Sequence, residues 1–187
     1  MALLARDRQY LQVMQEHVMS GPPPDQLILI DECIFSAKTY KPMAWSGKGR
    51  NVAQCRQMGS QRCVAVVAAV SAADGLILFE RRPSSYNGQQ FSEFMERLSA
   101  KVVDRPMTVL LDNCKIHKTR QTSEVLGREE IHVLWNVPYR PDLNGIEFVW
   151  AIAKRRFRQL QLQRMMGTLH QTFEECVDQA LAEVTRE

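Results

Sequence analysis

The sequence predicts an α/β domain built on a mixed five-stranded sheet that is flanked by helices. Five short segments rich in Val, Ile and Leu are the candidate strands, and turn residues or helical patterns separate them. The first three segments follow one another, with an Asp-Gly turn before the third, which is typical of an antiparallel meander. The fourth comes after a helical pattern of a dozen or more residues, so a right-handed crossover can place it parallel to the first.

The same patterns give the expected elements in chain order. We expect strands at residues 27–32, 62–71, 76–81, 107–113 and 131–135. Apolar residues at three- and four-residue spacing predict helices at 6–19, 89–103, 118–127, 144–163 and 169–184. The Ser-Gly-Pro-Pro-Pro segment ends the first helix. We therefore expect residues 1–24 to form a linker helix with a stiff joint, and residues 25–187 to form the domain with its C-terminal helix.

Length and composition limit the class of protein. The 187 residues, 45% of them hydrophobic and 24% charged, suit one domain or one domain with a short appendage. No apolar run approaches the ~20 residues that cross a bilayer, so no membrane partner is expected. The five cysteines are an odd number without a Cys-x-x-Cys pair, which favours reduced thiols in an intracellular protein and disfavours a structural zinc.

The net charge of +3 is small, but the basic residues are segregated along the chain. Residues 33–73 contain six Lys or Arg and no acid, and residues 148–164 contain five and no acid. Such segments suggest a polyanion partner, although they also fit solvated surfaces.

The first basic segment includes an expected Gly-rich loop at residues 36–60. There Trp45 lies among cations that include Lys48 and Arg50, a composition that suits contacts to phosphates and a stacked base. Alternatively, Trp45 packs on the core.

Two aspartates end apolar strands of the predicted sheet. Asp31 and Asp112 would emerge at the same edge if their strands are parallel, and ligands bind at this edge in open sheets. A carboxylate at the end of a buried strand is costly unless it is paired or binds a metal. Because side chains alternate along a strand, Asp31 and Glu32 point to opposite faces, so only one joins a given site. A turn-capping role for Asp31 is the alternative.

A third carboxylate, Glu147, follows the proline-broken loop at residues 136–143. Asn144 is a suitable N-cap for the next helix, and a Glu three residues after an N-cap is typical of a capping box. Local sequence therefore leaves a helix-capping role and a catalytic role open for Glu147.

The pattern of all three acids resembles the catalytic domain of mariner-type DDE transposases of the Tc/mariner superfamily. The segments that carry the resemblance are Leu-Leu-Asp112-Asn-Cys-Lys-Ile-His117-Lys and, after 34 residues between Asp112 and Glu147, Pro-Tyr-Arg-Pro-Asp-Leu-Asn-Gly-Ile-Glu147-Phe-Val-Trp. Leu-Ile-Asp31-Glu-Cys-Ile-Phe resembles the first aspartate motif, and Trp45 with the following Gly-Lys-Gly resembles a tryptophan-glycine segment downstream of it. The match covers about residues 25–160.

This resemblance implies a ribonuclease H-like fold and a site for two divalent metal ions, normally Mg²⁺, for which Mn²⁺ can substitute. Asp31 would bridge both ions, and Asp112 and Glu147 would each hold one. Carboxylate oxygens suit these hard ions, and two ions can serve in-line phosphoryl displacement without a nucleophilic side chain. The expected partner is DNA, and a homodimer is a reasonable expectation.

Basic residues near the three acids are candidate DNA contacts. His117 is placed to reach the scissile phosphate, or else is a histidine of a turn or helix start. Together with Trp45, Lys48, Arg50 and His117, the candidates are Lys115, Lys118, Arg140, Lys154, Arg155 and Arg158.

The sequence departs from the family pattern in two ways. Gly145 stands where the family usually has proline, which would loosen the start of the Glu147 helix. Family members also have N-terminal helix-turn-helix modules, for which this sequence has no room. We therefore expect a catalytic-domain fragment, a truncated copy or a domesticated derivative. The expected location is the nucleus in a eukaryote, or the cytoplasm and nucleoid in a bacterium.

Three functions are consistent with these observations. The first is a metal-dependent DNA endonuclease and strand transferase that cuts phosphodiester bonds and joins 3′-hydroxyl ends to target DNA. The second is a domesticated, non-catalytic DNA- or protein-binding module, against which the three intact acids argue. The third is an enzyme that cleaves RNA–DNA hybrids, which the 34-residue spacing and the motif around Glu147 disfavour.

Overall fold

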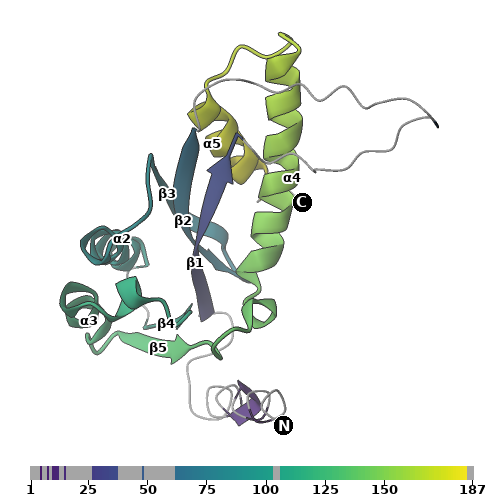
Figure 1. Cartoon of the computed structure of the whole chain (residues 1–187). Helices are drawn as coiled ribbons and strands as arrows, with labels where there is room; N and C mark the ends of the chain where they lie inside the picture. The colour runs from purple at the N-terminus through teal and green to yellow at the C-terminus, as the bar shows by residue number, and fades with distance from the viewer. Residues whose placement is uncertain are drawn as a thin grey trace.

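A mixed sheet of five strands separates two layers of helices in this computed structural model (Figure 1). The structure describes residues 27–37, 62–102 and 106–184, together with residues 5, 8, 10–12, 15 and 48. The strands lie in the order β3-β2-β1-β4-β5. Their bounds are Leu27–Ser36 for β1, Cys63–Ser71 for β2, Gly75–Arg82 for β3, Met107–Leu111 for β4 and Ile131–Trp135 for β5.

The strand directions confirm the predicted mixed sheet. Strand β2 is antiparallel to both β1 and β3, whereas β4 is parallel to β1 and β5 is parallel to β4. Every residue of β2 after Cys63 is buried, as expected of a Val- and Ala-rich strand covered on both faces.

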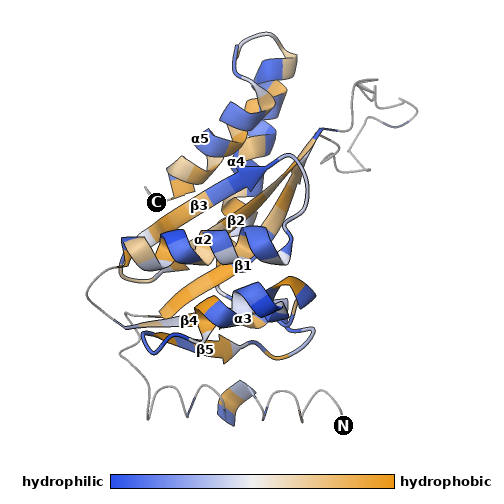
Figure 2. Ribbon diagram, turned by 90° about the vertical axis from the view of Figure 1, so that its left-hand side faces the viewer, coloured by the Kyte–Doolittle hydropathy of each residue, from blue (hydrophilic) through white to orange (hydrophobic). Residues whose placement is uncertain are grey.

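One face of the sheet is covered by α2 (Gly88–Lys101), α3 (Arg120–Leu126) and the 3-10 turn η2 (Lys115–Lys118). Helix α2 buries Phe91 and Phe94 against the side chains of Ile28 and Ile30 of β1. Figure 2 shows the strands as mostly apolar and the outward side of this layer as largely polar. The pattern is that of amphipathic helices on a buried sheet.

The other face is covered by α4 (Ile146–Met165) and α5 (Phe173–Val184). Phe35 of β1 meets Trp150 and Phe157 of α4 edge to face, with ring centroids 6.5 and 5.2 Å apart. Phe157 in turn meets Phe173 of α5 at 5.1 Å. These aromatic contacts fix α4 on the strand that carries Asp31.

Several boundaries differ from the sequence prediction. Strand β1 extends to Ser36, because pairing with β2 continues as far as Ser36 and Cys63. The helix expected at 118–127 is divided into η2 and α3, since Thr119 is extended and caps α3 by accepting a hydrogen bond from the Thr122 amide. The helix expected from residue 144 begins at Ile146.

The register of β1 against β4 decides where the two aspartates lie. The parallel pairs run from Leu27–Thr108 to Leu29–Leu110. Two residues beyond the last pair, the same register sets Asp31 opposite Asp112, after the ladder between the strands has ended. The two carboxylates therefore stand at the same edge of the sheet, beyond the last residue pair between their strands.

Some predictions fall outside the described residues. The joint at 20–24 does so entirely, as do Trp45 and Arg50, and the helix expected at 6–19 is described only at isolated positions. Among the described helices, none is long and apolar enough to cross a membrane.

Replacement of Phe157 by Ala should lower the free energy of unfolding by about 3–5 kcal/mol, because the ring is fully buried among aromatic neighbours. The exposed Phe148 on the same helix is the control, and its replacement by Ala should change stability by less than about 0.5 kcal/mol. Urea unfolding measures both. Equal effects of the two substitutions would contradict the packing described here.

Candidate active site

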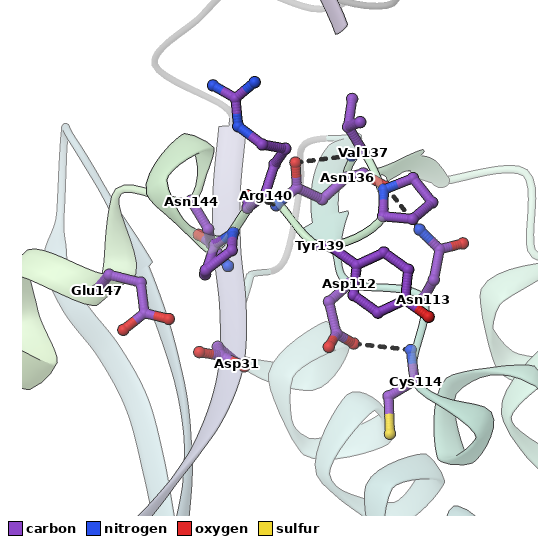
Figure 3. A pocket seen from close by; sticks show the side chains of 12 residues that line it. Asp31, Asp112, Asn113, Cys114, Asn136, Val137, Tyr139, Arg140, Asn144 and Glu147 are labelled. Carbon is purple, nitrogen blue, oxygen red and sulfur yellow. Dashed lines mark hydrogen bonds between the residues drawn. The ribbon is translucent and has the colours of Figure 1, made fainter. Parts of the chain in front are cut away.

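A cavity of about 400 Å³ lies at the edge of the sheet between β1, the end of β4 and the start of α4. All three predicted acids, Asp31, Asp112 and Glu147, line it, and the loop at residues 136–141 forms another part of its wall (Figure 3). In Figure 3, Asp31 lies between Glu147 on one side and Asp112 on the other. The structure thus brings together three carboxylates that are far apart in the sequence.

Asp31 is held by the helix layer that carries Glu147. The indole Nε1 of Trp150 donates a hydrogen bond of 3.1 Å to Asp31 Oδ2. Burial, together with the negative charges of Glu32 and Glu147, nevertheless raises the pKa of Asp31 to about 7. Burial is the largest of these causes, so Asp31 is a carboxylate that is costly to ionise without a positive partner.

Asp112 is held from the opposite side of the sheet. Its Oδ1 accepts hydrogen bonds from the backbone amide of Cys114 at 2.9 Å and lies 2.9 Å from His117 Nδ1. The hydrogen bond from His117 holds the pKa of the Asp112 carboxyl below its usual range. The contacts to Asp112 thus favour its ionised form.

His117 is a buried link between two carboxylates, with only 1% of its surface exposed. Nε2 lies 2.9 Å from Glu32 Oε1, and the ring packs on Phe91 with centroids 4.3 Å apart. Burial alone would lower the pKa of His117, but the hydrogen bonds with Asp112 and Glu32 outweigh it and raise the pKa to about 10. The ring is covered and both nitrogens are engaged, so the structure places His117 beneath the surface at which it was predicted to contact DNA.

Glu147 lies in the first turn of α4, and the capping box expected with Asn144 does not form. The N-cap is Gly145, and the Glu147 amide is bonded to the Asn144 backbone carbonyl at 3.1 Å. The 3-10 turn η3 (Pro141–Leu143) shifts the helix start by about one residue, so the carboxylate is directed to the cavity. Gly145 has φ −59°, a value that proline also adopts, so this start does not depend on the freedom of glycine.

The donor set suits hard divalent cations, since it consists of carboxylate oxygens around a polar opening. Within the described residues, however, no three His, Cys, Asp or Glu side chains are close enough to hold one ion together. In Figure 3 Asp31 lies between the other two acids, so two ions that share Asp31 would not require Asp112 and Glu147 to meet at one point.

The cavity wall exposes an aromatic side chain that sequence reasoning missed. Tyr139 is 87% exposed and has φ 63°, an uncommon conformation for a residue other than glycine. Asn136 Nδ2 donates to the Arg140 carbonyl at 2.9 Å, and Asn113 Nδ2 donates to the Asn136 carbonyl at 2.6 Å, which braces the loop. The sequence signal that could have indicated an exposed aromatic side chain here is its place between Pro138 and Pro141.

The predicted basic contacts occupy different positions. Lys48 and Lys115 are exposed. Lys118 donates to Asn113 Oδ1 at 2.7 Å and lies over the Trp135 ring. Arg140 forms a close ion pair with Asp142, which offsets its charge. Lys154, Arg155 and Arg158 lie on α4, and of these Arg155 is exposed while the other two are partly buried.

A protein-family model described as DDE superfamily endonuclease matches residues 26–169, which is well over half of the chain and includes all three acids. The chain belongs to the DDE superfamily endonucleases.

Solved structures show how widely this DDE endonuclease fold is shared. The Mos1 transposase paired-end complex with left transposon end matches with a TM-score of 0.68 and 13% identity over 97% of this chain and 61% of that chain. The catalytic domain of Mos1 mariner transposase matches with a TM-score of 0.57 and 11% identity over 97% and 87% of the two chains. A simian T-cell lymphotropic virus intasome in complex with PP2A regulatory subunit B56 gamma gives 0.59 and 14% over 87% and 49%.

The TM-scores establish a common fold, and the matches confirm the predicted ribonuclease H-like architecture. The present chain spans less than two thirds of the Mos1 chains in the paired-end and strand-transfer complexes. A comparison with curated protein sequences gives no match.

Replacement of Asp31 by Asn should stabilise the metal-free DDE domain at pH 8 by about 2 kcal/mol. The folded-state pKa of about 7 exceeds the usual value of 3.8, so the cost of ionising Asp31 is fully present above pH 7 and disappears as the pH falls towards 4. Asn retains the acceptor for Trp150.

Urea unfolding with chelator at pH 8 and pH 5 checks this, and the gain should be smaller at pH 5. A variant that is less stable than the wild type at pH 8, or equally stabilised at both pH values, would contradict it.

Proposed function

We propose that this chain is the catalytic part of a mariner-type DNA transposase, acting as a metal-dependent endonuclease and strand transferase. It would cut phosphodiester bonds to leave 3′-hydroxyl ends and join those ends to target DNA. The observation that carries the proposal is the convergence of Asp31, Asp112 and Glu147 on one cavity. Membership of the DDE superfamily endonucleases and the fold shared with transposase and integrase structures support it.

The three acids would hold two Mg²⁺ or Mn²⁺ ions, with Asp31 shared and Asp112 and Glu147 on either side. Two bound ions supply activation of a water or 3′-hydroxyl and stabilisation of the leaving oxygen. The neighbouring carboxylates of Glu32 and Glu147 add to the effect of burial on the pKa of Asp31, and the same negative charges would attract a cation.

Helix α4 offers a basic path that leads away from the acids. Lys154 and Arg158 follow Glu147 by about two and three helical turns, so all three lie on nearly the same side of α4. We propose that these two side chains contact DNA phosphates, as do Arg155, Lys115 and the basic loop with Trp45, Lys48 and Arg50. The exposed Tyr139 would add an aromatic face at the cavity.

The second candidate is a domesticated module that binds DNA or protein without catalysis. The three intact acids argue against it, but in the described part of the chain no three potential ligands surround a common point, so metal binding has to be tested directly. Titration with Mn²⁺ separates the two functions. A chain that binds no divalent ion at millimolar concentration is the binding module.

Replacement of Asp31, Asp112 or Glu147 by Ala should each abolish Mg²⁺- or Mn²⁺-dependent cleavage of duplex DNA while the fold remains intact. Cleavage gels and circular dichroism measure the two properties. Glu124→Ala is the control. This exposed acid pairs with Arg120 on α3, on the face of the sheet away from α4, so its loss should leave cleavage unchanged. Wild-type cutting by any of the three variants would overturn the assignment.

Replacement of both Lys154 and Arg158 by Ala should weaken binding to duplex DNA by roughly tenfold at low salt. The slope of log K against log salt should fall by about 2, since each phosphate contact contributes about 1. Fluorescence anisotropy at several salt concentrations measures both values. Arg120→Ala, on the other layer, is the control, and an unchanged slope in the double variant would exclude these two residues from the DNA path.

A further inference from the structure

We propose that Glu32 and His117 are positioning residues that fix the Asp112 carboxylate from the far face of the sheet. This role rests on the proposed function, and it assigns a part in the site to two residues that do not line the cavity. Glu32 follows Asp31 directly in β1 but points to the opposite face, where His117 lies.

The contacts form a continuous chain from Glu32 to Asp112. Glu32 Oε1 lies 2.9 Å from His117 Nε2, and His117 Nδ1 lies 2.9 Å from Asp112 Oδ1 and 3.1 Å from the Asp112 backbone carbonyl. The His117 side chain has no exposed surface and packs on Phe91. Contacts at both nitrogens and on the ring leave the imidazole one orientation.

Asp112 needs such support more than the other two acids do. Glu147 stands on a 20-residue helix and Asp31 lies within a strand paired to β2, whereas Asp112 follows the last residue of β4 in a stretch without regular structure. Half of its side-chain surface is exposed. Without His117, the Cys114 amide would be the remaining donor among the contacts described for this carboxylate.

The contacts also decide which oxygen a cation can use. His117 and Cys114 both contact Oδ1, so Oδ2 is the oxygen left for a metal ion. The contacts from Glu32 through His117 therefore leave Asp112 one oxygen for a metal ion and fix the direction of that oxygen. Outer partners that orient a metal ligand in this way typically change metal affinity by about 10–100-fold when they are removed.

The test compares the wild type with Glu32→Ala and His117→Gln. Both variants should require at least about tenfold more Mn²⁺ for half-maximal DNA cleavage, and the dissociation constant for Mn²⁺ measured by electron paramagnetic resonance should rise in parallel. Cleavage at saturating Mn²⁺ should fall much less. His117→Asn, whose amide can replace the Nδ1 donor, and Glu32→Gln, which keeps an acceptor for Nε2, should recover part of the affinity and serve if the first variants fold poorly.

Glu80→Ala is a matched control. Val67 of β2 pairs with Glu32 on one side and with Glu80 of β3 on the other, so the two acids lie in one row across the sheet. Their side chains are 20% and 21% exposed, and Glu80 forms an ion pair with Arg97 as Glu32 does with His117. Glu80→Ala should lower stability without changing the Mn²⁺ requirement.

The outcomes separate this role from the proposed function. If Glu32→Ala and His117→Gln match the wild type in Mn²⁺ requirement and Mn²⁺ affinity, or if Glu80→Ala shifts them equally, Glu32 and His117 do not position Asp112, although the proposed function stands. If the wild type neither binds Mn²⁺ nor cuts DNA, the proposed function fails and this role fails with it.

Discussion

The parallel register of β1 against β4 is the constraint on which the site depends. Three paired residues set the offset between the strands, and continuing that offset places Asp31 and Asp112 side by side just after the ladder ends. Earlier parting of the strands would separate the carboxylates, and longer pairing would join the strands there with backbone hydrogen bonds. The rest of the molecule maintains this short pairing, since β2 supports the other edge of β1 along nine residue pairs.

Each helix layer orients different acids of the site. On one face, α4 carries Glu147 and directs the Trp150 indole to Asp31, and aromatic packing on Phe35 sets its position. On the other face, η2 carries His117, which packs on Phe91 of α2 and reaches Asp112. Both layers have apolar cores of their own. Apolar packing on both faces of the sheet therefore supports the strands, while burial of Asp31 near Glu32 and Glu147 opposes its ionisation.

Sequence periodicity predicted all five strands, because apolar runs and alternation are local signals. With the right-handed crossover it also predicted that Asp31 and Asp112 share an edge of the sheet. Sequence periodicity could not predict contacts between residues that are far apart in the chain. Glu32 and His117 are 85 positions apart, so nothing local indicated that the histidine is buried between two carboxylates. The capping box failed because a 3-10 turn at Pro141 displaces the start of α4. The left-handed backbone of Tyr139 also has no local signature. The domain limits and the metal-binding roles of the acids stay predictions.

Adjacent acids with opposite directions have a consequence for folding accuracy. A strand that slips by one residue turns every side chain to the other face. In β1 such a slip would carry Glu32 towards Trp150 and Asp31 towards His117, so acids of the wrong length would meet both partners and the ladder to β2 would shift as well. The adjacent Asp and Glu therefore favour the correct register, because only there does each donor meet an acid of the matching length.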